Sequence, residues 1–309
     1  MNRSAITKAT CDRGHRATSC ALCVFAAVVA ALAMTSSAMA KTVTVDGQKI
    51  TMQPKLAAEV PASVKSTGLT NITYNNDPPD GDVVNGKLEG WETDIATAVA
   101  AELGLPLKST PSGAFDAFIP GLQNGRYNSS FTSFIETPPR IKQIDIVTYY
   151  NVGTGFAVGK TSSIKIRKPT DVCGHTIAQL TGAAFGQQIK SIPCKAKGLK
   201  PATVENFPSF TAAELAVSSG RVQIFTASED QLSWLIQKTA HQFVLQPLDF
   251  QPVPEGAGLT KGIGLAKPVA DAVDALIKSG AYAAILKKWS LTGAGLVKKA
   301  TIYSTDGGK

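Results

Sequence analysis

Residues 113–135, GAFDAFIPGLQNGRYNSSFTSFI, predict a helix, a stop and a strand in immediate succession. Four apolar residues follow the i, i+3, i+4, i+7 spacing of one helix face: Phe115, Phe118, Ile119 and Leu122. Gly125 is expected to end this helix, and Phe131–Ile135 to form the strand. Residues 210–227, FTAAELAVSSGRVQIFTA, repeat the same order, with Gly220 as the stop. Two copies of one unit predict two similarly built α/β lobes.

Strand and helix patterns also alternate in the flanking sequence. We expect strands at Leu69–Tyr74 and Ile144–Val147 and a helix at Asp94–Leu103. A closing pair of helices is predicted over Asp271–Trp289, with the break at Gly280. Alternation of this kind is typical of an α/β protein.

Two Gly-rich extended stretches, Tyr150–Gly159 and Glu255–Gly264, flank the middle third of the chain. If both cross between the lobes, the first lobe is built from both chain ends and the second is inserted. The predicted divisions are a loose lead-in (41–66), lobe 1 (67–151 with 259–309) and lobe 2 (152–258). Two such hinge strands predict a clamshell that opens and closes, with a ligand-binding cleft between its lobes.

The first forty residues have the features of a signal peptide. Four Lys and Arg residues against one Asp precede an apolar run from Ala21 to Met34, and Ala38-Met39-Ala40 forms an A-x-A cleavage site. We expect cleavage after Ala40 and export to the periplasm; the alternative is an uncleaved N-terminal anchor. The remaining chain would carry 27 Lys and Arg against 22 Asp and Glu, a net charge of +5. These charges are spread along the chain, so no nucleic-acid partner is expected.

Three of the five cysteines lie within residues 1–40, which leaves Cys173 and Cys194. An even pair in an exported chain predicts a disulfide. A metal site is the rival interpretation, but these cysteines with His175 supply three ligands at no standard spacing, so no metal is predicted.

Several segments resemble, in order, the polar amino-acid family (family 3) of ABC-transporter periplasmic solute-binding proteins. They are residues 88–105 (LEGWETDIATAVAAELGL), 113–150, 216–236 (AVSSGRVQIFTASEDQLSWLI) and 261–291. The resemblance covers about residues 68–292. It implies a type II two-lobed clamshell with two hinge strands and a discontinuous first lobe. It also implies a monomer without a cofactor that captures an amino acid or a related carboxylate for an inner-membrane ABC permease.

The resemblance assigns a carboxylate site to the first lobe. In the family, the arginine that matches Arg140 grips the α-carboxylate of the ligand. A guanidinium suits this role because it presents two parallel donors, which lysine cannot do. Ser133 matches a position at the carboxylate end of the site, and Tyr74 and Phe115 lie near positions at the cleft rim.

The second lobe departs from the family pattern. Where the family usually has an aspartate for the α-ammonium group, this chain has Ser228, which offers only a neutral hydrogen bond. Either Glu229 or Asp230 replaces that aspartate through a bulge, or the ligand lacks a standard α-amino group. The family's Q-x-G-T-T loop is altered here to residues 179–183, QLTGA, so Thr181 and Gly182 are the expected contacts.

The first lobe departs as well. Around Pro78-Pro79, where the family carries aromatic residues, this chain has Asp77 and Asp80. Together with Glu136 these residues predict an acidic pocket that favours a cationic side chain; the alternative is a solvated acidic loop.

Two other functions stay open at this stage. Some relatives of the family are dehydratases of carboxylated cyclohexadienyl compounds, and Glu136 or Glu229 could then serve as general acid. A sensory binding protein that reports to a receptor is the other possibility. The sequence contains neither an H-E-x-x-H nor a G-x-S-x-G motif, so a binding protein is preferred over an enzyme.

Overall fold

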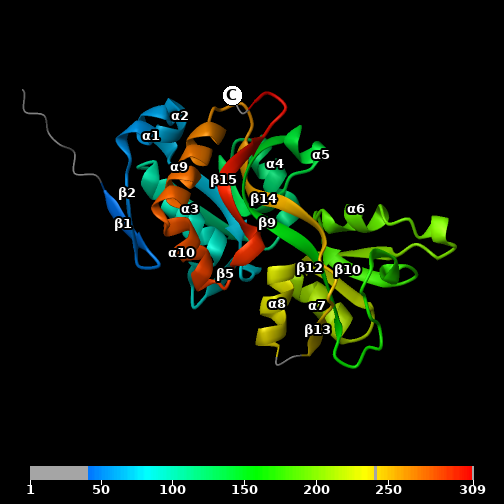
Figure 1. Cartoon of the computed structure of the whole chain (residues 1–309). Coiled ribbons are helices and arrows are strands. Elements are labelled where there is room, and N and C mark those ends of the chain that lie inside the picture. The colour runs from blue at the N-terminus through cyan, green and yellow to red at the C-terminus, as the bar shows by residue number, and fades with distance from the viewer. Residues whose placement is uncertain (1–40, 240–241, 308–309) are drawn as a thin grey trace, which may run out of the picture. The chain divides into compact units, whose positions relative to one another are not determined.

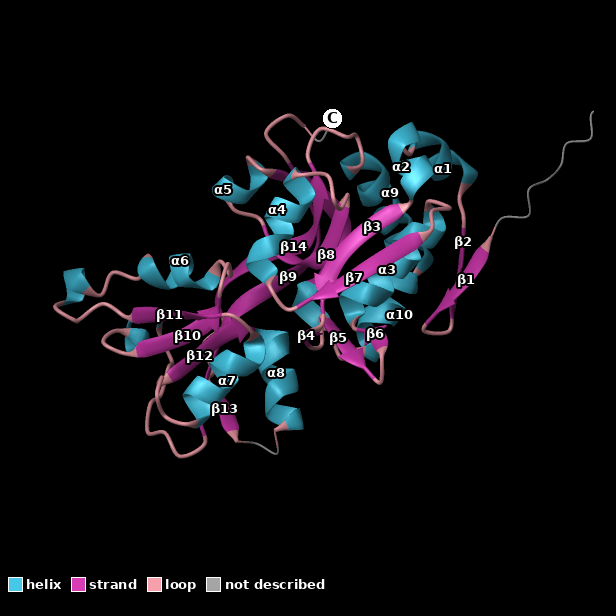
Figure 2. Ribbon diagram, turned by 180° about the vertical axis from the view of Figure 1, so that it is seen from behind, coloured by secondary structure: helices cyan, strands magenta, loops and turns pink. Residues whose placement is uncertain are grey.

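Two long strands connect two lobes in the computed structural model, which describes residues 41–239 and 242–307 (Figure 1). The predicted signal peptide, residues 1–40, lies outside the described residues. Strands β9 (Ile144–Gly159) and β14 (Phe250–Thr260) pair antiparallel and lie side by side from one lobe into the other (Figure 2). The fold is therefore the expected two-lobed α/β clamshell. Residues 255–259 of β14 already pair with a strand of lobe 1, so the crossing lies before the predicted boundary at residue 258.

The strands of both lobes join one ten-stranded sheet with the order β11-β10-β12-β9-β14-β8-β3-β7, and β13 and β15 pair with β9. Lobe 1 contributes β3 (Leu69–Tyr74), β7 (Leu107–Ser112), β8 (Ser129–Ile135) and β15 (Leu296–Tyr303). Lobe 2 contributes β10 (Thr176–Leu180), β11 (Thr203–Phe207), β12 (Ile224–Ser228) and β13 (Phe243–Leu245). In each lobe the central strand pairs parallel with its neighbours, which requires helical crossovers.

Helices supply those crossovers. Lobe 1 has α3 (Trp91–Glu102), the 3-10 helix η1 (Phe115–Ala117), α4 (Phe118–Gln123), α5 (Pro138–Ile141), α9 (Ala266–Ser279), α10 (Ala281–Lys288) and η4 (Gly293–Gly295). Lobe 2 has η2 (Pro169–Val172), α6 (Phe185–Lys190), η3 (Lys195–Lys197), α7 (Phe210–Ser218) and α8 (Glu229–Lys238). Within residues 41–239 and 242–307, no helix has the length and apolarity that crossing a membrane requires.

Most of the elements predicted from local periodicity are present. The strand at Leu69–Tyr74 and the helix pair that closes the chain are confirmed, and Gly280 separates the two helices with a φ of +82°. The helix predicted from Phe115 onward is divided into η1 and α4. Residues 75–89 contain a small antiparallel sheet of β4 (Asn76–Asp77), β5 (Gly81–Val84) and β6 (Lys87–Glu89).

The sequence left the order of the lead-in over residues 41–66 open, and the structure gives it regular elements. This segment forms a hairpin and two short helices: β1 (Thr42–Val45), β2 (Gln48–Thr51), α1 (Pro54–Glu59) and α2 (Ala62–Thr67). Its apolar residues, among them Ile50 and Val64, are buried in the same cluster as Trp91 and Val273 of α3 and α9. Burial of these side chains stabilises the segment on lobe 1.

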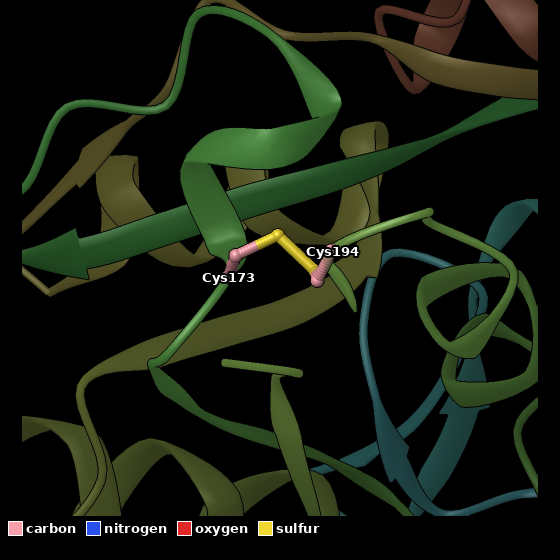
Figure 3. Close-up of a disulfide and its surroundings, with 2 residues drawn as sticks. All are labelled: Cys173 and Cys194. Carbon is pink, nitrogen blue, oxygen red and sulfur yellow. A yellow bond between two sulfur atoms is a disulfide. The ribbon is translucent and has the colours of Figure 1, made fainter. Parts of the chain in front are cut away.

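The predicted disulfide is present in lobe 2, where it joins Cys173 and Cys194 (Figure 3). The two cysteines are 21 residues apart and their Cα atoms lie 5.7 Å from each other, which is within the usual range for a disulfide. Cys194 is buried in the cluster that contains Ile177 and Ile224 of β10 and β12. The bond therefore ties the segment after α6 to the sheet of lobe 2.

Candidate ligand-binding cleft

A cavity lies between the two lobes and is lined from both sides. The space between its lining residues is about 490 Å³ when the open solvent at its mouth is counted. Three aromatic side chains of lobe 2, Phe185, Phe210 and Phe225, form an apolar wall. Lobe 1 and the hinge strand β14 contribute charged and polar groups, including Arg140 and Glu255. A concave, mostly apolar site with a few convergent polar groups is the usual form of a small-molecule site.

Arg140 lines this cavity from the short helix α5, which begins at Pro138. Its side chain is only 8% exposed and lies over the rings of Phe115 and Phe134, with its Cζ atom 5.4 and 5.3 Å from their centroids. Nη1 donates to the carbonyl oxygen of Ile135 at 2.8 Å. Burial lowers the pKa of Arg140 to about 10, so the guanidinium remains charged at neutral pH.

No carboxylate of the described residues forms an ion pair with Arg140. A buried cation without a counter-ion is costly. The arginine is thus prepared for an anionic partner that the described part of the chain does not supply.

The lobes touch each other across the cavity. Arg140 Nη2 donates to the carbonyl oxygen of Gly182 in lobe 2 at 2.8 Å. From the other side, Gln231 Nε2 of helix α8 donates to Asp77 Oδ1 at 3.0 Å and to Asp80 Oδ2 at 3.3 Å. Apolar contact between Ile135 and residues of lobe 2 adds to these bonds. This arrangement corresponds to lobes that are closed on each other.

Asp80 is fixed by three neighbours at the acidic end of the cavity. Trp91 Nε1 donates to its Oδ1 at 2.7 Å, while Ser133 Oγ lies 2.8 Å from its Oδ2 and Gln231 approaches the same oxygen. Ser133 holds a left-handed backbone conformation, with φ of +51°, at the point where its side chain meets both Asp80 and Glu92. Strained backbone of this kind is concentrated at functional sites.

Glu92 supports this end of the cavity from inside lobe 1. It is fully buried and accepts hydrogen bonds from the Ser133 hydroxyl and from the Tyr149 hydroxyl. Burial raises the pKa of Glu92 to about 7, against the lowering effect of these hydrogen bonds. The Ser133 hydroxyl has one proton, so it donates to either Asp80 or Glu92 at any moment. The second contact is also a hydrogen bond when the other carboxyl is protonated and donates to the serine oxygen.

Other carboxylates gather at the same end. Burial raises the pKa of Asp77, Asp80 and Glu255 well above the usual range, and the nearby Asp230 carboxylate raises them further. Burial also raises the pKa of Asp230 itself. Within the described ranges, none of these groups forms an ion pair with Lys, Arg or His. The cavity is therefore lined by one cation, Arg140, and by an excess of carboxylates.

The structure places the predicted site residues in three groups. Six line the cavity: Tyr74, Asp77, Phe115, Ser133, Arg140 and Ser228. Gly182 contributes the carbonyl oxygen that accepts from Arg140. Four do not line it: Glu136, Thr181, Glu229 and Asp230.

The physical reasons differ among these four residues. The Thr181 hydroxyl is used within lobe 2, where it donates to the carbonyl oxygen of Phe207 at 2.9 Å. Glu229 and Asp230 form the first turn of α8 and line a separate hollow behind the hinge, so no bulge brings either side chain into the cavity. Glu136 is only half-buried and has no place in the acidic group.

Sequence analysis missed Glu255, Gln231 and Glu92. Glu255 lies in the Gly-rich hinge strand and lines the cavity. A single carboxylate in an otherwise apolar stretch was the feature of the sequence that could have pointed to it. Gln231 stands three residues after Ser228, and the two form a capping box at the start of α8. The S-x-x-Q spacing of that box was visible in the sequence. Within the described ranges, no group of His, Cys, Asp and Glu side chains is arranged to hold a metal ion.

The sequence profile of the bacterial extracellular solute-binding proteins, family 3, matches residues 69–292. The chain belongs to this family. The amino-acid-binding protein AabA of Dichelobacter nodosus is 24% identical over 208 residues, which are 66% of this chain and 80% of AabA.

Solved structures agree with this family assignment. An ancestral arginine-binding protein bound to arginine superposes with a TM-score of 0.64 at 29% identity, over 72% of this chain and 97% of that structure. The ancestral amino acid-binding protein AncCDT-1, a precursor of cyclohexadienyl dehydratase, has a TM-score of 0.63 at 26% identity, over 74% and 97% of the two chains.

Proposed function

We propose that this family 3 solute-binding protein captures an amino acid, or an amino-acid-like carboxylate, in the periplasm and delivers it to an ABC importer. The observation that carries the proposal is the buried guanidinium of Arg140 in the cleft, which has no carboxylate partner among the described residues. A ligand carboxylate would compensate this charge through two parallel hydrogen bonds. The names of its relatives, an amino-acid-binding protein and arginine-binding proteins, support the same ligand class.

Binding would act through closure of the lobes. Arg140 comes from lobe 1 and Gln231 from lobe 2, so a ligand between them contacts both lobes only when they are closed. Such differential contact stabilises the closed form. An importer would recognise this closed form as the ligand-bound state. No cofactor or covalent step is required.

The dehydratase alternative receives less support. One similar structure is a precursor of cyclohexadienyl dehydratase, but both glutamates considered as general acid, Glu136 and Glu229, lie outside the cavity lining. A general acid must come within hydrogen-bond reach of the reacting group.

The experiment is isothermal titration of the purified protein with the twenty standard amino acids and with prephenate. We expect at least one amino acid to bind with a micromolar or lower dissociation constant. Absence of binding by all of them would refute the proposal, and an aromatic product from prephenate would favour the enzyme. Export is tested separately by N-terminal sequencing of the periplasmic protein, for which we expect Lys41 as the first residue.

A further inference from the structure

We infer that the ligand of this cleft carries more positive than negative charge, with one carboxylate against Arg140 and N–H-bearing cationic groups against Asp77, Asp80 and Glu255. This inference rests on the function proposed above, because it takes the carboxylate contact with Arg140 as given. It adds the chemical class of the ligand: a basic amino acid or a basic amino-acid-like molecule.

The first observation is a polar atom without a partner. Glu255 is only 2% exposed, lines the cavity and has an Oε1 atom with no hydrogen-bond partner among the described residues. Buried polar atoms are nearly always paired, so this oxygen indicates a hydrogen-bonding ligand group in the cavity beside it.

The second observation is a deficit of positive charge. Asp77 accepts a hydrogen bond from the side-chain amide of Gln231. Asp80 accepts from the same amide and also from Trp91 and Ser133. All these donors are neutral. Asp77 and Asp80 are 2% and 1% exposed, so little solvent remains to compensate their charges.

The number of carboxylates decides between neutral and basic ligands. A neutral zwitterion brings one ammonium group, which would leave most of the three lining carboxylates, Asp77, Asp80 and Glu255, without a cationic partner. A second cationic group reduces that excess. Because the free oxygens accept hydrogen bonds, an ammonium or guanidinium fits them better than a quaternary amine, which has no N–H donor.

The third observation is that lobe 2 contributes apolar aromatic side chains to the cavity. Phe185, Phe210 and Phe225 line the cavity opposite the polar groups of lobe 1. Basic side chains pair a polar head with an apolar methylene stem. The wall therefore matches the stem, while the carboxylates match the head.

The first test compares ligands that have the same backbone and stem but a charged or an uncharged side-chain end. We would titrate the protein with arginine against citrulline, and with lysine against norleucine. We expect the basic member of at least one pair to bind about 10- to 100-fold more tightly than its neutral match, as for a charged hydrogen bond in a buried site. Equal or tighter binding of the neutral member in both pairs overturns this inference and leaves the proposed function intact. Absence of binding by all standard amino acids overturns both.

The second test uses Glu255→Gln, which keeps the shape of the side chain and removes its charge. We expect about a tenfold loss of affinity for the tighter basic ligand, with less than about a twofold change for its neutral match. Glu214→Gln is the matched control: Glu214 is a half-buried carboxylate of lobe 2 whose pKa burial also raises, but it does not line the cavity.

Equal loss of affinity for both ligands in Glu255→Gln would overturn the charge role. If that variant does not fold, as judged by circular dichroism, Asp77→Asn is the second variant, with the same expected selectivity between basic and neutral ligands.

Discussion

Arg140 Nη2 donates a hydrogen bond to the carbonyl oxygen of Gly182, 2.8 Å away on the opposite lobe. A charged donor is here paired with a neutral main-chain acceptor, as is Arg140 Nη1 with Ile135. The two bonds fix the plane of the guanidinium at the cleft and leave its other N–H groups for a ligand. One residue thus takes part in both lobe contact and ligand binding.

Arg140→Lys should weaken binding of the preferred amino acid by about 10- to 100-fold in calorimetry, because lysine keeps the charge but loses the fork geometry. The matched control is Arg126→Lys. Arg126 is an exposed arginine of the same lobe that also lies over a ring, that of Tyr127, at 5.3 Å. We expect the control to bind as the parent does. An unchanged affinity in Arg140→Lys would place the carboxylate anchor elsewhere.

The unliganded protein should lose stability as the pH rises from about 5 to 8. Burial raises the pKa values of Asp77, Asp80, Asp230 and Glu255 above their unfolded values, and that of Glu92 to about 7. Between the unfolded and the folded pKa, the folded state therefore binds more protons than the unfolded chain. Stability then falls as the pH rises through this window, which begins near 4.

Thermal unfolding at pH 5, 6.5 and 8 without ligand measures this effect, and we expect the highest melting temperature at pH 5. The Glu59–Lys267 pair acts in the opposite sense, since Lys267 lowers the pKa of Glu59, but its contribution changes only below pH 5. Affinity for a basic ligand should increase over the same pH range, because ionised carboxylates bind it better. A melting temperature that rises steadily from pH 5 to 8 would contradict the buried acidic group.

Replacing both disulfide cysteines, Cys173→Ser with Cys194→Ser, should lower stability by about 3 kcal/mol, as expected for closing a loop of this length. For a chain of this size that is a fall of about 6–12 °C in melting temperature. Neither cysteine lines the cavity, so ligand affinity should remain within about twofold. Reduction of the parent protein with dithiothreitol should reproduce the same fall. An unchanged melting temperature in both experiments would show that the bond adds nothing to folding.

Local periodicity was sufficient for the regular elements. The strand at Leu69–Tyr74 and the helices on either side of Gly280 have apolar spacings that few other structures satisfy. The hairpin at the start of the chain was missed although its signal was present. Asp46-Gly47, both with positive φ, stands between two alternating segments, and Asp-Gly is a strong two-residue hairpin signal.

The sequence did not predict all of the carboxylates that line the cavity, because pairing between strands far apart in the sequence brings them together. Glu255 comes into place through the register of β14, which sets it opposite Ile135 on β8 and Tyr150 on β9. No local pattern contains that register. Sequence analysis named Glu136 instead, which follows Ile135 in the sequence. Glu136 lies outside the cavity lining.

Asp77→Asn tests whether the acidic end is kept for binding at the expense of stability. Asp77 is 2% exposed, its neighbours include the Asp230 carboxylate, and its one amide donor comes from Gln231. Asparagine keeps an oxygen for Gln231 and removes one of several like charges, so the unliganded protein should gain about 1–2 kcal/mol, or about 2–8 °C in melting temperature at pH 8. Affinity for the preferred basic ligand should fall by about tenfold or more, since a charged hydrogen bond is lost. The gain in stability should shrink as the pH falls, because burial raises the pKa of the parent carboxyl and more of it is then protonated. A variant that is less stable than the parent at pH 8, yet binds basic ligands equally well, would mean that Asp77 serves the fold and not the ligand.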